Sequence, residues 1–274
     1  MSFLRNLVDK FRGRVHGLPL PVAFTSTKGG VGKTLNCANT ALKLSEMGKR
    51  VGVIDCDIES PTLARYFGIM GQDTKTDVNT RMMEPITFRN IKIQSMATFL
   101  MNEPRRFCYF DGETIQNFLI DLILSTNWGK LDVLIADAPP TLSDEIIALK
   151  KIFRKFGGVI IVGTPERQTL DGAERSLNFY KQQGIKILGL VENMSGSESA
   201  CCHAPMVCKH CGDEVIPYAG HGLKGLAQRY NVPFLGSLPF NPLFAQNNSS
   251  HKHFIHNDYK VFERCAEAIL QKRR

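Results

Sequence analysis

The sequence lacks any apolar run long enough to cross a bilayer. Its longest apolar stretches, such as 51–54 and 158–162, have the length of single strands, whereas a membrane-spanning helix needs about 20 apolar residues. Four charged side chains interrupt the first dozen residues, so the continuous apolar region of a secretory signal is missing as well. These absences exclude an integral membrane protein and an ordinary secreted one, and they predict a cytoplasmic location.

A basic surface large enough to coat a nucleic acid is also missing. The 274 residues carry a formal charge of +8, but residues 1–16 and residues 251–274 each hold net +3, so the body is nearly neutral. Because nucleic-acid binding needs a clustered basic footprint, we do not expect DNA as a partner. The basic ends leave a weak membrane contact open.

Strand-like and helix-like stretches alternate along the chain, without internal repeats or low-complexity tracts. The expected strands are 22–26, 51–55, 91–95, 132–137, 159–162, 187–191 and 234–237, and the expected helices are 34–47, 114–125, 144–155, 170–183, 223–230 and 258–271. This alternation predicts an α/β fold, namely a doubly wound, mostly parallel sheet with helices on both faces.

The expected domain organisation follows from the same pattern. A short amphipathic pattern precedes the first strand, and a polar, cysteine-rich segment follows the strand at 187–191, so that we expect a loop over 193–220. We therefore predict an N-terminal extension over 1–21 and one domain over 22–274 that carries an inserted metal-type loop at 195–220.

A glycine-rich loop joins the first expected strand to the first expected helix. Glycines let a backbone wrap phosphate oxygens without Cβ clashes, and the helix N-terminus adds its positive dipole end. In such a loop the last lysine reaches the β- and γ-phosphates, and the threonine after it binds Mg²⁺. The predicted triphosphate site consists of Thr27, Lys28, Gly29, Gly30, Val31, Gly32, Lys33 and Thr34.

Two aspartates stand where expected strands end. Asp57 follows the strand at 51–55, and Asp137 ends the strand at 132–137. The carboxyl ends of parallel strands lie beside the phosphate crevice of such folds. Asp137 fits an acid that holds Mg²⁺ through water together with Thr34, and Asp57 fits an acid that also contributes to the Mg²⁺ site and orients the attacking water. An exposed aspartate is a poor base, so positioning is the expected role.

The second lysine of the loop, Lys28, makes it resemble the deviant Walker A motif of the MinD/ParA/Mrp class of P-loop ATPases. The resemblance implies a P-loop NTPase-type sheet and a homodimer that sandwiches two ATP molecules, in which each Lys28 acts in trans on the partner's phosphates. Lys28, Lys33, Asp57 and Asp137 would then be the catalytic residues. The chain has no Asn-Lys-x-Asp motif, and Asn193 matches the asparagine with which this class holds the base, which favours ATP.

Five later runs make the chain similar to the Mrp family within this class. These runs are 55–62, 137–145, 189–195, 207–212 and 232–239. The resemblance implies a carrier or scaffold for iron–sulfur clusters, in which Cys208 and Cys211 of two subunits bridge a 4Fe–4S cluster that passes to apo recipient proteins. The chain departs from the family at Ser60 and Thr141, which replace glycines, and at Cys201 and Cys202, which are additions.

The cysteine spacing leaves the metal open. Cys208 and Cys211 supply two thiolates from one turn, whereas a tetrahedral Zn²⁺ or a cubane cluster needs four ligands. Either a second subunit completes the site, or Cys201, Cys202 or His203 closes it within one chain, which would favour Zn²⁺. Two other functions also stay open, namely a MinD/ParA-type positioning ATPase and an ATP-gated, reductase-like electron donor.

Overall fold

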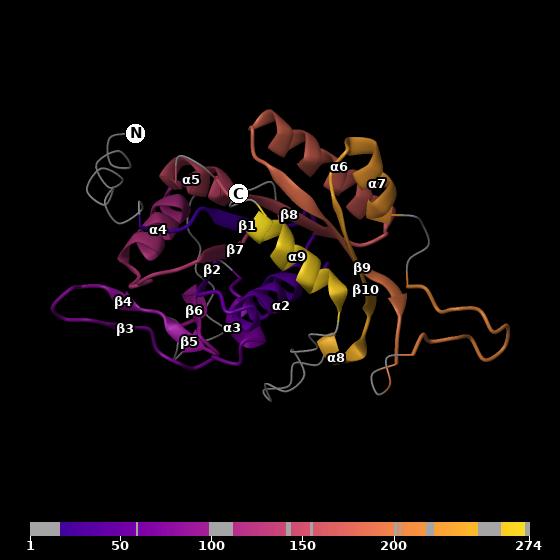
Figure 1. Cartoon of the computed structure of the whole chain (residues 1–274), viewed down its shortest axis with the longest axis horizontal. Coiled ribbons are helices and arrows are strands. Elements are labelled where there is room, and N and C mark those ends of the chain that lie inside the picture. The colour runs from indigo at the N-terminus through magenta and orange to yellow at the C-terminus, as the bar shows by residue number, and fades with distance from the viewer. Residues whose placement is uncertain are drawn as a thin grey trace.

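An eight-stranded sheet forms the centre of the computed structural model (Figure 1). The structure describes residues 17–58, 60–98, 112–140, 144–153, 156–199, 202, 204–217, 222–245 and 259–271. Most of the expected N-terminal extension, as well as Thr141, Cys201 and His203, therefore lies outside the described residues.

Seven of the eight strands run parallel, in the order β10-β9-β8-β1-β7-β2-β6, and the antiparallel β5 forms one edge. Their bounds are β1 (Pro21–Thr25), β2 (Val51–Asp55), β5 (Ile86–Phe88), β6 (Ile91–Gln94), β7 (Val133–Asp137), β8 (Gly158–Gly163), β9 (Ile187–Ser197) and β10 (Phe234–Phe240). A separate hairpin pairs β3 (Lys75–Thr76) with β4 (Met83–Glu84). The central strands are buried along their whole length, because helices cover both faces of the parallel sheet.

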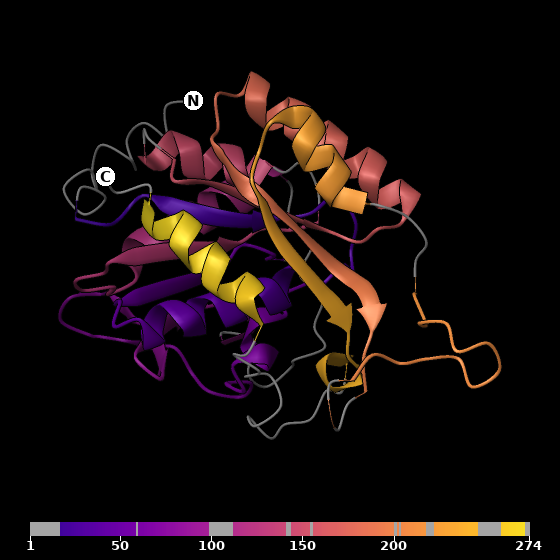
Figure 2. The ribbon, with the colours of Figure 1, turned by 45° about the vertical axis from the view of Figure 1, so that its right-hand side comes forward.

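Two hydrophobic cores, one on each face of the sheet, hold the helices in place. The first lies under α2 (Lys33–Glu46), α3 (Leu63–Tyr66) and α9 (Lys260–Leu270), and the second under α4 (Gly112–Ser125), α5 (Asp144–Phe153), α6 (Arg167–Gln182) and α7 (Gly222–Tyr230). Figure 2 shows α9 crossing the near face of the sheet. Two short helices, η1 (Met96–Thr98) and α8 (Pro242–Ala245), complete the described elements. No described helix is long and apolar enough to span a membrane.

The predicted fold class is confirmed, and each expected strand has a counterpart within a few residues. The expectation of a loop from residue 193 onward was wrong, because β9 continues to Ser197. Its extension is stabilised by β10, which pairs Leu238 with Asn193 and Phe240 with Ser197. The sequence pattern missed this extension because its residues are polar, although Asn193 and Ser197 are buried.

Candidate nucleotide site and cysteine hairpin

The glycine-rich loop connects β1 to α2 in a conformation that only glycine adopts readily. Gly30 and Gly32 have φ angles of 79° and 86°, in the left-handed region. A Cβ atom on Gly32 would also clash with the side-chain amide of Asn193. That amide donates a hydrogen bond to the Val31 carbonyl at 2.9 Å, so Asn193 on β9 holds the loop from the side.

The two loop residues predicted to meet the phosphates and Mg²⁺ both contact Asp137. The Lys33 Nζ lies 2.7 Å from Asp137 Oδ1, and the Thr34 hydroxyl donates to Asp137 Oδ2 at 2.7 Å. The Lys33 and Asp137 side chains are only 8% and 1% exposed. Burial opposes the charge of Lys33, but the adjacent Asp137 carboxylate outweighs it and raises the pKa of Lys33, which keeps the lysine protonated.

A second buried acid, Asp55, joins this cluster and was not among the predicted site residues. Its carboxylate accepts hydrogen bonds from the Ser95 hydroxyl at 2.9 Å and from the backbone N–H of Asp57 and Leu63, each at 3.2 Å. Burial, reinforced by the charge of Asp137, raises the pKa of Asp55 to about 8. The sequence signal for Asp55 was its position at the end of β2, but only the fold shows that its carboxylate is buried.

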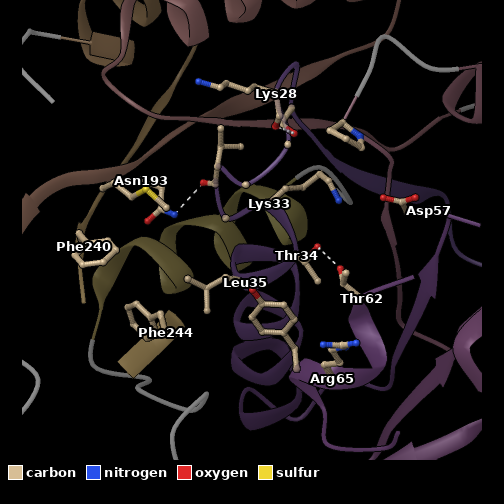
Figure 3. A pocket seen from close by; sticks show the side chains of 18 of the residues that line it. Lys28, Lys33, Thr34, Leu35, Asp57, Thr62, Arg65, Asn193, Phe240 and Phe244 are labelled. Atoms are coloured by element: carbon tan, nitrogen blue, oxygen red, sulfur yellow. Dashed lines mark hydrogen bonds between the residues drawn. The ribbon is translucent and has the colours of Figure 1, made fainter. Parts of the chain in front are cut away.

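Asp57 lies at the wall of the same pocket, half-buried. Its Oδ1 accepts the backbone N–H of Ser60 at 3.1 Å, so the carboxylate shapes the loop that follows β2. In Figure 3 it stands on the side toward which Lys33 extends. The four predicted positions Lys33, Thr34, Asp57 and Asp137 thus come together at the carboxyl ends of three neighbouring strands.

The loop opens into a pocket of about 440 Å³ (Figure 3). Asn193 and Met194 form one wall next to the loop, and Phe240 and Phe244 lie beyond them. The opposite wall carries Arg65. A cavity of this size with phosphate donors at one end and aromatic rings at the other can hold a nucleotide.

Lys28 is placed differently from Lys33. The two lysines extend in opposite directions from the loop (Figure 3), and the Lys28 Nζ pairs with Glu166 Oε2 at 2.7 Å. Lys28 is 44% exposed at this position, so its amine is accessible at the surface of the chain. Thr27, which replaces the usual first glycine, contacts α6 where Gly172 leaves room for its side chain.

The segment 204–217, which contains Cys208 and Cys211, projects from the sheet beyond β9 (Figures 1 and 2). Backbone hydrogen bonds close the turn, from Cys208 to Asp213 at 2.7 Å and from Gly212 to Cys208 at 2.9 Å. Cys208 is half-buried and Cys211 exposed. The backbone N–H groups of Cys211 and His210 lower the pKa of the Cys208 thiol, which favours the thiolate that a metal needs.

The residues that the structure describes do not by themselves close a metal site within one chain. Among the residues that it describes, no group of three or more His, Cys, Asp or Glu side chains could hold a metal ion. Cys202 is described and exposed, but it forms no such group with Cys208 and Cys211. The cysteine turn therefore offers two thiols of the four ligands that a tetrahedral site needs.

The fold and the loop geometry define a P-loop NTPase of the MinD/ParA class. Solved structures with the same fold include the nucleotide-binding protein of Archaeoglobus fulgidus in complex with ADP, with a TM-score of 0.73, 23% identity and coverage of 93% of this chain and 96% of the other. The cell division ATPase MinD of Pyrococcus furiosus gives a TM-score of 0.60 at 19% identity, over 93% of this chain and 99% of its own. At these identities the likeness shows the fold.

The family follows from the sequence comparisons. Residues 20–272 match the ParA family model described as NUBPL iron-transfer P-loop NTPase, so the chain belongs to this family. It is 31% identical to the cytosolic Fe-S cluster assembly factor CFD1 of Saccharomyces cerevisiae, over 94% of this chain and 88% of that protein. It is also 31% identical to the cytosolic Fe-S cluster assembly factor NUBP2 of Gallus gallus, over 94% of each chain. The predicted family resemblance is confirmed.

Proposed function

We propose that this chain is a dimeric ATPase that assembles and carries iron–sulfur clusters in the cytosol. The observation that carries the proposal is a two-thiol turn, with half-buried Cys208 and exposed Cys211, on a chain that also holds a complete phosphate loop. Two thiols cannot satisfy a four-ligand cargo, so a second copy of the turn completes the site. The relatives named as cytosolic Fe-S cluster assembly factors support the cargo and the location.

In this proposal the loop residues bind ATP, and the acid cluster around them holds Mg²⁺. The backbone of 27–34 surrounds the phosphates, and Lys33 exchanges its Asp137 partner for phosphate oxygens. The residues fit Mg²⁺, because Thr34 and Asp137 already present a hydroxyl and a carboxylate to one another and such oxygen ligands suit this ion. Mg²⁺ would neutralise phosphate charge, with Thr34, Asp57 and Asp137 as its direct or water-mediated ligands.

Hydrolysis needs a positioned water and a cation that stabilises the charge of the transition state. Asp57 fits the first requirement, because its carboxylate faces the pocket and is fixed by the loop after β2. Lys28 fits the second requirement in trans, since its side chain is 44% exposed and extends away from Lys33 (Figure 3). Asn193 and the aromatic wall would then hold the adenine.

The cluster itself is cargo. The proposed 4Fe–4S cluster bridges the Cys208 and Cys211 pairs of two subunits, and apo recipient proteins take it from there. Closure of the dimer around ATP would change the separation of the two pairs, so that nucleotide state and cluster affinity influence each other reciprocally.

Anaerobic purification followed by iron and sulfide analysis tests this proposal. We expect four iron and four sulfide per dimer after reconstitution, and a transfer of the cluster to an apo ferredoxin that responds to ATP. A zinc-loaded monomer would contradict the shared cluster. A cluster that cycles between redox states without leaving the protein would instead favour an electron donor.

A further inference from the structure

The structure assigns Glu198 as the positioning residue that couples the nucleotide pocket to the cysteine turn; this inference rests on the proposed function. Glu198 follows directly after β9 and is 6% exposed. It stands where the chain leaves the sheet and enters the segment that carries Cys208 and Cys211.

On one side, Glu198 is bonded to the wall of the nucleotide pocket. Its carboxylate oxygen Oε1 accepts the side-chain N–H of Asn241 at 2.7 Å, and its backbone N–H donates to the Phe240 carbonyl at 3.1 Å. Phe240 and Asn241 both line the pocket. A nucleotide that presses on this wall would therefore displace the groups that hold Glu198.

The same carboxylate oxygen is bonded to the helix that covers this region. The Tyr259 hydroxyl donates to Glu198 Oε1, and the Tyr259 ring contacts Phe244 with centroids 5.8 Å apart. Phe244 is another residue of the pocket wall. Three groups at the pocket wall are thus connected to Glu198. Asn241 bonds its carboxylate, Phe240 accepts its backbone N–H, and Phe244 contacts the ring of Tyr259, whose hydroxyl bonds the carboxylate.

On its other side, Glu198 begins the base of the cysteine segment. It forms an isolated antiparallel bridge with Pro205, and the neighbouring Ser197 carbonyl accepts the Met206 N–H at 2.9 Å. Met206 in turn accepts the Val215 N–H at 2.7 Å, which joins the two arms that flank the cysteine turn. A shift of Glu198 therefore moves the base of both arms, because these bonds connect them in series.

The strand itself supplies a rigid connection between the two sites. β9 carries Asn193, which holds the phosphate loop through the Val31 carbonyl, and reaches Glu198 five residues later. The Ser195 hydroxyl donates to the Leu238 carbonyl at 3.1 Å and ties this stretch to β10. ATP would act on this stretch at Asn193, and the cluster would act on it at Glu198. Each ligand would therefore favour the conformation of the stretch that the other ligand binds more tightly.

A comparison of ATP-analogue affinities with and without the cluster tests Glu198. Wild-type protein is reconstituted anaerobically with iron and sulfide, and the Kd of a slowly hydrolysed ATP analogue is measured by calorimetry in the apo and loaded forms. We expect the two values to differ by about fivefold or more. Glu198→Met keeps the side-chain length but removes both acceptor oxygens, and it should bring the ratio of the two Kd values to within about twofold of one.

Two further variants separate coupling from folding. Tyr259→Phe removes only one donor to Glu198 and should reduce the ratio partially. The matched control is Tyr230→Phe, which removes a similar hydroxyl from Glu174, bonded at 2.8 Å between α6 and α7 and away from the pocket. This control should keep the wild-type ratio. Thermal unfolding of each apo protein shows which variants are folded.

The outcomes distinguish the inference from the proposed function. A wild-type protein that retains no iron contradicts both. A loaded wild-type protein whose two Kd values are equal, or a folded Glu198→Met variant that keeps the wild-type ratio, overturns the role of Glu198 alone. If Glu198→Met does not fold, Tyr259→Phe decides, and an unchanged ratio in that variant overturns the inference.

Discussion

Replacement of Lys33 by methionine should have two separable effects, one on nucleotide binding and one on the stability of the apo protein. Methionine keeps the apolar stem but removes the amine that lies 2.7 Å from Asp137. A charge-assisted hydrogen bond contributes about 1.5–3 kcal/mol, so the loss of one or more phosphate contacts should weaken ATP binding by about tenfold to more than a hundredfold.

The effect on stability follows from the burial of Asp137, whose side chain is 1% exposed. Removing one partner of a buried ion pair leaves an uncompensated charge and costs about 3–5 kcal/mol. For a domain of this size, each kcal/mol corresponds to about 2–4 °C in Tm, so calorimetry of apo Lys33→Met should show a Tm that is lower by about 10 °C. Lys28→Ala is the control, because an exposed pair with Glu166 contributes at most about 1 kcal/mol.

The pH dependence of the Tm deficit of Lys33→Met tests whether the lost charge of Lys33 is its cause. In the wild type, the charge of Lys33 opposes the rise in the pKa of Asp55 that burial causes, so removing the amine raises the pKa of Asp55 further. The cost of an ionised Asp55 without Lys33 is therefore present at high pH and shrinks as the pH falls and Asp55 takes up a proton. We expect a larger Tm deficit at pH 8 than at pH 5, relative to wild type. A deficit that is equal at both values would show that the lost ion pair is not its cause.

Three further predictions concern other residues of the two sites. Gly32→Ala should lower stability by at least about 1–2 kcal/mol and weaken ATP binding, because the φ angle of Gly32 is 86° and the new Cβ meets Asn193. In the control Gly29→Ala, the new Cβ meets nothing within 4 Å, so the Tm should stay nearly unchanged. Cys208→Ala should abolish iron retention in anaerobic reconstitution, whereas Cys202→Ala should keep it. Because the pKa of Asp55 is raised to about 8, its contribution to wild-type stability should fall as the pH rises from about 4 to 8, measured by thermal unfolding.

The parts of the fold that could be predicted from the sequence are those determined by local patterns. The apolar strands β2 and β8 and the loop between β1 and α2 are recognisable from their own residues. Asp137 could be predicted too, because a strand end places it beside the loop whatever the rest of the chain does.

The remaining features depend on partners that are distant in the sequence. β9 extends through polar residues because β10 pairs with them more than 40 residues later. The pairing of Lys28 with Glu166 joins the phosphate loop to the start of α6 across 138 positions. Glu198 has no motif around it, and its importance becomes visible only when Asn241 and Tyr259 meet its carboxylate.

The strand order explains why two carboxylates, Asp55 and Asp137, repel each other in the nucleotide site. β2 lies next to β7, and Asp55 pairs in register with Asp137, so the topology brings two carboxylates into one buried edge. One lysine, Lys33, offsets them, and the raised pKa of Asp55 keeps a proton in the cluster and relieves the repulsion. In the proposed function a triphosphate would add negative charge to this edge, and Lys33 would leave Asp137 for the phosphates. Part of the binding energy would then be consumed in rearranging the cluster, which would connect the occupancy of the pocket to the loops that follow β2 and β7.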